Sequence, residues 1–460
     1  MLQSLLNIFR IEELRNKVLF TLSMLVVFRI GHWIPVPGVN HEELERLFRT
    51  MGTDSVFGKV AGMVAMFSGG SLSQSTIFGL GIMPYITAGI IFQLVSSVPG
   101  SPLKRLQDEG PTGRQKVQEY TRYAAVGLAV VQGVGWLSFL KAQNMVYQEW
   151  ASNPVWWVMA ITTLTAGAVF LMWLGEQIDR HGIGNGASLI ITAGILGGMP
   201  GAIQSVIQSF NPEGQGLGWM GLIMLAAGFV LVVAGSVIMT VAQRRIPIQQ
   251  AKHTRGRKVF GGQRSYLPLR VNHGGVMPII FASSLMVFPS LIFAQLGAMF
   301  SKGGVLGGTI SFLGDNFNPG AYLYILAYIA MVYFFSYFWI TVQFNPEEMS
   351  KQLKEHGSFI PGLRPGPRTA EYLETVMNRV TFVGAAFLSV VAILPVVINK
   401  SMGIDYMVTQ FFGGTGLLIV VSVTMDFLQR VDANLLMRNY AGLLGGGEDS
   451  KGPRLKGPRS

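Results

Sequence analysis

The segment MFSGGSLSQSTIFGLGIMPYI, residues 66–86, decides the fold, because it breaks an apolar run that otherwise extends from Val60 to Val95. Glycines loosen a helical backbone, and hydroxyl and amide side chains need hydrogen-bond partners that lipid does not offer. The run therefore does not cross a bilayer as one plain helix. We expect a segment that enters the membrane, breaks at SGGSLSQS and continues as a full helix from Thr76.

Composition supports a membrane location. The 460-residue chain is 50% hydrophobic and 13% charged, whereas a soluble domain has about 25% charged residues. Cysteine is absent, which excludes disulfides, thiolate metal ligands and thiol nucleophiles. The six histidines are separated along the sequence, and no phosphate-loop, HExxH or GxSxG motif occurs. We therefore expect a polytopic membrane protein that has no metal site or cofactor and is not an enzyme.

Ten apolar runs are long enough to cross a bilayer, which takes about 20 residues per helix. The fifth and tenth are the weakest, because AGILGGMPG and QFFGGTG interrupt them. The predicted fold class is an all-α polytopic membrane protein with ten transmembrane helices, which begin near Lys17, Thr76, Thr121, Pro154, Ala187, Gly218, Gly274, Ala321, Val380 and Met407.

Charge predicts the orientation of these helices. Most of the 35 lysines and arginines precede the first run or lie in alternate loops and the C-terminal tail, so the positive-inside rule places both termini in the cytoplasm. We expect an N-terminal half (residues 1–212), a C-terminal half (213–440) and a flexible basic tail (441–460). Because each half has an odd number of spans, the two are inverted, which permits an inverted repeat with a site between them. Arg29, within the first run, is read as snorkelling to the outer surface.

Residues 58–75 combine a short apolar helix with the SGGSLSQS break. About ten residues are too few to span a bilayer. A half-inserted helix is tolerated only inside protein or beside a water-filled cavity. This segment is a candidate stopper for such a cavity, and a segment that merely packs between spans is the alternative.

Ile82 and Ile86 follow the break one helical turn apart, with Pro84 between them. Branched aliphatic side chains around a narrow aqueous path make it dewet, which seals it against ions without a charged filter. Taken alone, isoleucines at this spacing are more often packing or lipid-facing residues.

The two largest cytoplasmic loops, residues 243–272 and 344–379, are basic. Every charged residue in the first loop is Lys or Arg, and proline and glycine interrupt both loops in RRIP, SYLPL and IPGLRPG. Proline and glycine at these positions favour ordered hairpins over flexible linkers. We expect a docking surface for an anionic partner, either ribosomal RNA or an acidic protein face.

Two further functional classes remain open at this point, an inverted-repeat secondary transporter of a small solute and a membrane enzyme with an unrecognised motif. Glu176, Asp179 and Asp426 fall at predicted cytoplasmic helix ends rather than deep within spans. An ion-coupled transporter usually has an ionisable residue at depth, so their position disfavours the transporter. The glycine-rich GIGNG, residues 182–186, predicts a turn rather than a nucleotide fingerprint.

Six ordered segments resemble hallmark sequences of the bacterial SecY family of protein-translocation channels. They are SGGSLSQSTIFGLGIMPYITAGIIFQL, GEQIDRHGIGNGASLII, RRIPIQQAK with GRKVFGGQRSYLPLRVN, GVMPIIFASSL, GSFIPGLRPGPRTAEYL and FGGTGLLIVVSVTMDFLQ. The resemblance implies an hourglass channel in the bacterial cytoplasmic membrane, with two five-helix halves that open like a clamshell. Such a channel passes unfolded secretory polypeptides and releases apolar segments sideways into lipid. The implied partners are SecE and SecG subunits, the SecA motor, the ribosome and signal-bearing precursors.

The resemblance also implies roles for individual residues. The plug would include Met66, Phe67, Ser68, Gly69, Gly70, Ser71 and Leu72. The pore ring would be formed by Ile82, Ile86, Ile191, Ile280 and Ile419. The lateral gate, between the second and third spans and the seventh and eighth, would include Thr87, Ser284 and Phe288. SecA or ribosome docking would involve Arg255, Arg257, Lys258, Arg264 and Arg364. The family pattern is not followed everywhere, since Gln74 replaces a basic plug residue of some members.

Overall fold

The computed structural model describes most of the chain. The described residues are 11–44, 75–98, 100–151, 153–210, 218–250, 253–255, 258–260, 264–286, 289, 312–313, 316–317, 321–363, 365–402, 408, 411 and 414–444.

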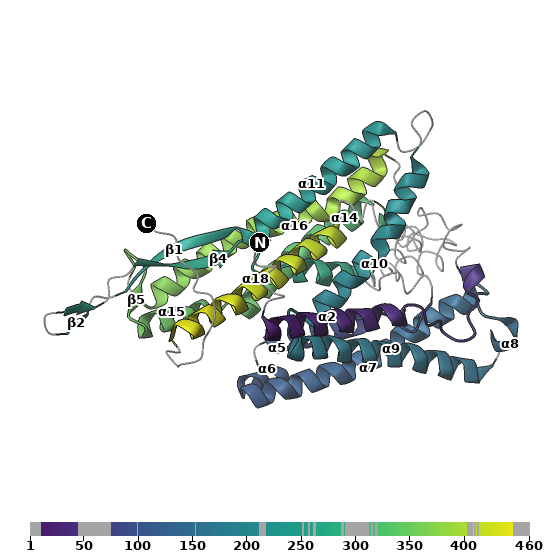
Figure 1. Cartoon of the computed structure of the whole chain (residues 1–460), viewed down its shortest axis with the longest axis horizontal. Coiled ribbons are helices and arrows are strands. Elements are labelled where there is room, and N and C mark those ends of the chain that lie inside the picture. The colour runs from purple at the N-terminus through teal and green to yellow at the C-terminus, as the bar shows by residue number, and fades with distance from the viewer. Residues whose placement is uncertain are drawn as a thin grey trace.

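The helices of the N-terminal part form one layer. α5 packs on α7, α7 on α9, and α9 on α2. Figure 1 shows these helices side by side, with α10 leaving the layer at an angle. Their bounds are α2 Glu12–Gly31, α5 Met83–Ser97, α6 Pro102–Asp108, α7 Pro111–Ala142, α8 Gln148–Ala151, α9 Pro154–His181 and α10 Gly186–Ser209.

The helices of the C-terminal part form a second layer. α14 packs on α16, α11 packs on α18, and α10 contacts both α18 and α2, so that α10 joins the two layers (Figure 1). The bounds are α11 Trp219–Val241, α14 Tyr322–Gln343, α15 Pro346–Glu355, α16 Pro367–Met402 and α18 Thr415–Leu444, together with a short apolar helix, Met277–Met286.

A β-hairpin arm projects from one end of the helical body (Figure 1). β1 (Gln243–Gln250) pairs antiparallel with β4 (Arg264–Arg270), and β1 also pairs with β5 (Ser358–Phe359), which gives the strand order β4-β1-β5. β2 (His253–Arg255) and β3 (Lys258–Phe260) form a second antiparallel pair at the tip. The ordered hairpin predicted for residues 243–272 is confirmed.

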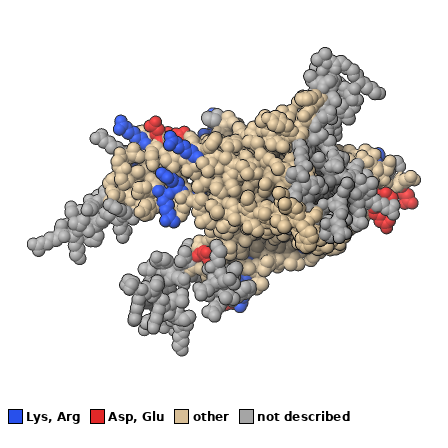
Figure 2. All heavy atoms as spheres, turned by 90° about the horizontal axis from the view of Figure 1, so that it is seen from above, with Lys and Arg blue, Asp and Glu red and all other residues tan. Residues whose placement is uncertain are grey.

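The surface is that of a membrane protein. Within the described residues, six helices are long and apolar enough to cross a bilayer, or seven if the bent pair α5 and α6 is one span. Figure 2 shows charged side chains at the two ends of the molecule and a wide uncharged band between them. Exposed apolar side chains such as Val230 (64%) and Ile238 (64%) of α11 fit contact with lipid rather than water. The predicted polytopic membrane class is confirmed.

The count of ten spans stays a prediction, although a helix lies at or near the position of each predicted run. α2 carries charges at both ends, including Lys17 and Arg29, and so is not counted as apolar enough. α18 begins only at Thr415, and most of the apolar run that precedes it lies outside the described residues. α10 runs unbroken through Pro200, so the AGILGGMPG segment does not interrupt the helix as expected.

The second predicted span begins later than expected. The prediction of a helix from Thr76 is wrong, because residues 75–82 form turns and the helix starts at Met83. Thr76 instead forms a β-bridge with Pro35, and Gly81 adopts a φ of 56°, outside the right-handed helical region. Pro84 lies in the first turn of α5, where its missing N–H breaks no helical hydrogen bond, rather than within a continuous helix as expected.

Candidate functional site: an isoleucine cluster between two helical layers

The five isoleucines predicted as a pore ring all belong to one large apolar core or pack against it. Ile82, Ile191, Ile280 and Ile419 are buried members of this core, with exposed fractions of 2%, 2%, 1% and 0%, and Ile86 packs against it. They come from both layers: the start of α5, α10, the helix Met277–Met286 and α18. We call these five residues the isoleucine cluster. Four of these side chains are thus almost fully buried inside the apolar core.

The backbone at the start of α5 places Ile82 and Ile86 on the same side of the helix. Ile82 is the residue before the first turn of the helix, and its carbonyl accepts a hydrogen bond from the Ile86 N–H at 3.1 Å. The two side chains are therefore one turn apart on the same side of the helix. On the opposite layer, the Ile280 N–H donates to the Val276 carbonyl at 3.1 Å, which fixes the first turn of its helix.

The GIGNG segment directs α10 toward the cluster. Gly184 has a φ of 107°, which a residue with a Cβ adopts only with strain, so the chain reverses between α9 and α10 at this point. Asn185 Oδ1 then accepts from the Ser188 N–H at 3.0 Å, and Asp179 Oδ1 accepts from the Gly186 N–H at 2.8 Å. The predicted turn is confirmed, and it begins the helix that carries Ile191 into the cluster.

One of the three predicted gate residues, Ser284, lies where the layers touch, and a second, Thr87, is buried on α5. Ser284 Oγ donates to the Ile280 carbonyl at 2.7 Å and lies 3.9 Å from Met83 Sδ of α5. Thr87 is buried, and its hydroxyl donates to the Met83 carbonyl at 2.9 Å. The helix Met277–Met286 and the start of α5 are thus in direct contact across 201 residues of sequence separation. Phe288 lies outside the described residues.

A charged pair near the C-terminal end of α9 was not anticipated from sequence. Arg122 of α7 donates two hydrogen bonds to the Glu176 carboxylate of α9, with Nε and Nη2 at 2.6 and 2.8 Å from its oxygens. The side chains are 34% and 20% exposed. Opposite charges in two neighbouring spans were the available signal, but a separation of 54 residues in sequence concealed the pairing.

A second charged pair could be predicted from its i,i+4 spacing in the sequence alone. Asp426 accepts from Arg430 Nε at 2.8 Å, four residues along α18. Among the described residues, no group of three or more His, Asp or Glu side chains is placed to hold a metal ion.

The predicted plug and docking residues are described in part at most. The plug, Met66 to Leu72, lies outside the described residues, as do Arg257 and Arg364. For Arg255, Lys258 and Arg264 the structure describes the backbone, which places Arg255 opposite Lys258 at the tip of the arm.

The base of the arm is described with its side chains. Arg244 and Arg245 of β1 and Arg270 of β4 are exposed there. Figure 2 shows basic side chains gathered at this end of the molecule. The arm therefore presents positive charge on the side of the membrane from which it projects.

Known proteins resemble this chain over nearly its whole length. The "Protein translocase subunit SecY" of Pseudomonas aeruginosa is 41% identical over 436 residues, which cover 94% of each chain. The protein of the same name from Escherichia coli (strain K12) is 40% identical over 435 residues, again 94% of each chain, and that of Chlamydia muridarum is 38% identical over 456 residues, 96% of this chain and 98% of its relative.

Solved structures share the fold. A protein-conducting channel aligns with a TM-score of 0.58 at 19% identity, over 94% of this chain and 95% of the channel. The idle yeast Ssh1 complex bound to the yeast 80S ribosome contains a chain that aligns with a TM-score of 0.58 at 15% identity, over 90% of this chain and 89% of its own. The SecY family model matches residues 76–428, a stretch that holds the whole isoleucine cluster. This chain therefore belongs to the SecY family.

Proposed function

We propose that the chain is the pore-forming subunit of a bacterial protein-conducting channel, a multi-pass membrane protein that passes unfolded polypeptides across the membrane. The observation that carries this function is the burial of all five isoleucines, from both helical layers, in or against one apolar core, and we infer that they line a dry constriction. The family relationship supports it, since relatives at 38–41% identity are named protein translocase subunits.

The cluster seals the pore by shape and polarity. Water leaves a narrow passage lined by branched aliphatic side chains, and an ion then loses its hydration without any compensating ligand. A moving polypeptide is different, because its own side chains fill the opening and replace the contacts that the isoleucines make in the apolar core. The seal therefore needs no charged filter and no chemical step.

The contact between Ser284 and Met83 supports a lateral gate. It joins the two layers through one thioether and one hydroxyl rather than through an ion pair. Separation of α5 from the helix Met277–Met286 would open the pore toward lipid, with Thr87, Ser284 and Phe288 along the seam. An apolar segment in the pore gains about 25 cal/mol per Å² of apolar surface that it moves from water into lipid. Sideways release then follows the hydrophobic effect.

Direction of transport is supplied by partners on the cytoplasmic side. We infer that the arm, with Arg255, Arg257, Lys258 and Arg264, and the loop that contains Arg364 receive a ribosome or the SecA motor. Ribosome-bound relatives such as the Ssh1 complex support ribosome docking. The charge of the arm supports a cytoplasmic location for both chain termini by the positive-inside rule. SecE and SecG are the proposed companion subunits.

The remaining sequence-based roles complete this proposal. Residues 58–75 would form the plug, including Met66 to Leu72, below the isoleucine cluster. The two inverted halves would be residues 1–212 and 213–440. A secondary transporter is not favoured, because Glu176 and Asp426 are each paired with an arginine and so hold no free site for a coupling ion.

Translocation by the purified complex tests this function. Proteoliposomes that contain the chain with its companions, the motor and ATP should protect a signal-bearing precursor from added protease, and protection should be lost without the signal segment. Solute-driven uptake of a small molecule with no precursor protection would contradict the proposal and favour a transporter.

A further inference from the structure

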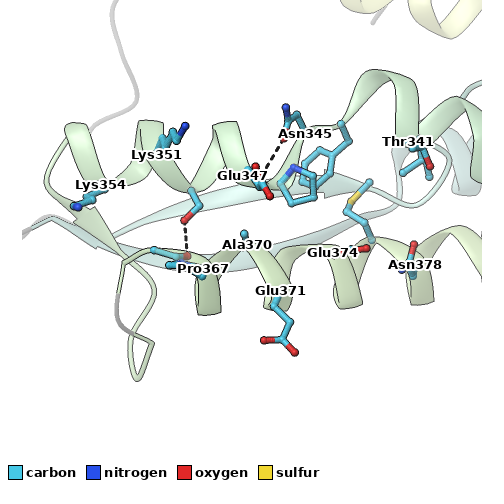
Figure 3. A pocket seen from close by; sticks show the side chains of 16 residues that line it. Thr341, Asn345, Glu347, Lys351, Lys354, Pro367, Ala370, Glu371, Glu374 and Asn378 are labelled. Carbon is cyan, nitrogen blue, oxygen red and sulfur yellow. Dashed lines mark hydrogen bonds between the residues drawn. The ribbon is translucent and has the colours of Figure 1, made fainter. Parts of the chain in front are cut away.

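A groove separate from the pore lies between α15 and the first turns of α16. Its volume is about 760 Å³, and Figure 3 shows the side chains that line it. Ile340, Phe344 and Met377 form an apolar floor, with exposed fractions of 7%, 8% and 1%. Ser350 Oγ donates to the Gly366 carbonyl at 2.8 Å and holds the two sides at a fixed separation. The groove is therefore a built feature of the fold rather than a gap between loose segments.

Its two rims differ in charge. Lys351 and Lys354 lie along α15 together with Glu347, whereas the charged lining residues of α16, Glu371 and Glu374, are both acidic (Figure 3). We call Lys351 and Lys354 the lysine rim, and Glu371 and Glu374 the glutamate rim. Each pair is three residues apart and so faces the same way on its helix. All four are exposed, and none is paired with another described residue. The groove thus offers a ligand two lysines beside one carboxylate on α15, and carboxylates as the charged groups of α16.

One end of the groove leads to the lipid-facing surface. Thr341 and Asn378 line that end. Tyr337 Oη donates to the Asn378 carbonyl at 3.4 Å, and the rings of Tyr333 and Phe382 lie 5.6 Å apart further along the same seam between α14 and α16. Phe382 is 57% exposed, as expected of a side chain that faces acyl chains. Tyrosines are common at the level of lipid headgroups, so the groove opens at the membrane interface.

We propose that this groove binds the headgroup of a zwitterionic aminophospholipid. The phosphate is held by the lysine rim, the primary ammonium by the glutamate rim, and the acyl chains follow the seam of Tyr333 and Phe382. Phosphatidylglycerol supplies a phosphate but leaves the carboxylates without a cation. Phosphatidylcholine supplies a cation whose methylated nitrogen donates no hydrogen bond. Only the aminophospholipid satisfies both rims.

Lipid binding to the purified channel complex tests this site. Delipidated complex is titrated with phosphatidylethanolamine, phosphatidylcholine or phosphatidylglycerol of identical acyl chains, and the bound lipids are counted by native mass spectrometry. We expect phosphatidylethanolamine to bind about threefold more tightly than either of the others, because only its ammonium donates hydrogen bonds to the glutamate rim, an exposed contact worth under about 1 kcal/mol.

Paired variants separate the two rims. In Lys351→Gln with Lys354→Gln, binding of phosphatidylethanolamine and phosphatidylglycerol both fall. In Glu371→Gln with Glu374→Gln, the preference for phosphatidylethanolamine over phosphatidylcholine disappears while phosphatidylglycerol binding persists. The control, Lys116→Gln with Glu119→Gln, removes one exposed charge of each sign on α7, outside the groove, and leaves the preference unchanged.

Three results would overturn the proposal. They are equal binding of the three lipids by the unaltered complex, a preference for phosphatidylglycerol, and a phosphatidylethanolamine preference that survives loss of both rims. Cross-linking of Lys351 to another protein in native membranes, with no lipid retained, would assign the groove to a peptide partner and equally contradict lipid binding. Because the readout is lipid bound and not transport, failure here leaves the proposed channel function untouched.

Discussion

The hydroxyl of Ser284 lies 3.9 Å from the sulfur of Met83, so the helix Met277–Met286 touches α5 beside the isoleucine cluster. We choose these two positions for a cysteine pair because their side chains touch across the layers, and a disulfide forms where the two Cα atoms lie within about 7 Å. The chain has no cysteine of its own, so this pair is the only thiol pair present within it.

Oxidation of Met83→Cys with Ser284→Cys should lock the seam. We expect translocation of a signal-bearing precursor to stop under oxidising conditions and to recover with reductant, because a locked seam prevents the layers from separating. Each single-cysteine variant serves as the control and should be insensitive to oxidant. Full translocation by the cross-linked protein would remove the lateral gate from the account.

The ion pair of Arg122 and Glu176 should matter to the rigidity of the N-terminal layer. Arg122→Gln leaves a partly buried carboxylate without its bidentate partner, which we expect to cost about 1–3 kcal/mol. Thermal unfolding of the purified complex in detergent should therefore begin at a lower temperature. The charge exchange Arg122→Glu with Glu176→Arg should recover part of the loss, whereas a purely steric role for Arg122 predicts no recovery.

Close packing at Gly167 gives a sharper test of the α9 position. A Cβ at this residue would overlap the Ile77 carbonyl in the segment that leads into α5, whereas Gly135 of α7 has nothing within 4 Å of such a Cβ. Gly167→Ala should lower stability by about 1–3 kcal/mol through overpacking. Gly135→Ala should be neutral or slightly stabilising, since alanine favours helix. Equal melting temperatures for the two variants would contradict the described approach of α9 to Ile77.

His273, between β4 and the helix Met277–Met286, should give the fold a pH dependence. Burial, followed by the charge of Arg270, lowers the pKa of the imidazole below its ordinary value of 6.5. The unfolded chain then binds a proton more readily than the folded chain, so stability is complete above about pH 6.5 and falls as the pH drops toward the lower folded pKa. In His273→Gln this part of the pH dependence should vanish from unfolding curves recorded between pH 5 and pH 8, and an unchanged slope would assign it to other groups.

Much of the helical fold could be predicted because a bilayer requires long apolar runs, and these are visible in sequence. The turn at Gly184 and the hairpin of β1 and β4 could also be predicted, because glycine and proline act on the local backbone. The start of α5 could not, because the bridge of Thr76 to Pro35 is a tertiary contact that overrides the apolar pattern.

The candidate site could be predicted from the sequence only in part, because it also depends on tertiary contacts. Family resemblance pointed to the five isoleucines, but their burial in or against one apolar core depends on the packing of both layers. The pair of Arg122 and Glu176 joins two helices, and the charged groove forms only when α15 folds back along α16. Contacts between distant segments leave no periodic signal along the chain.

Ion conductance across planar bilayers is the most direct measurement of the central claim, that the isoleucine cluster keeps the pore dry. The account predicts that Ile82→Asn with Ile280→Asn admits water and raises the leak of small ions, about tenfold for each 1.4 kcal/mol removed from the barrier. The control Ile91→Asn alters an isoleucine of α5 that is 45% exposed and should leave the bilayer tight. A double variant that folds, inserts and conducts no more than the unaltered channel would contradict the claim.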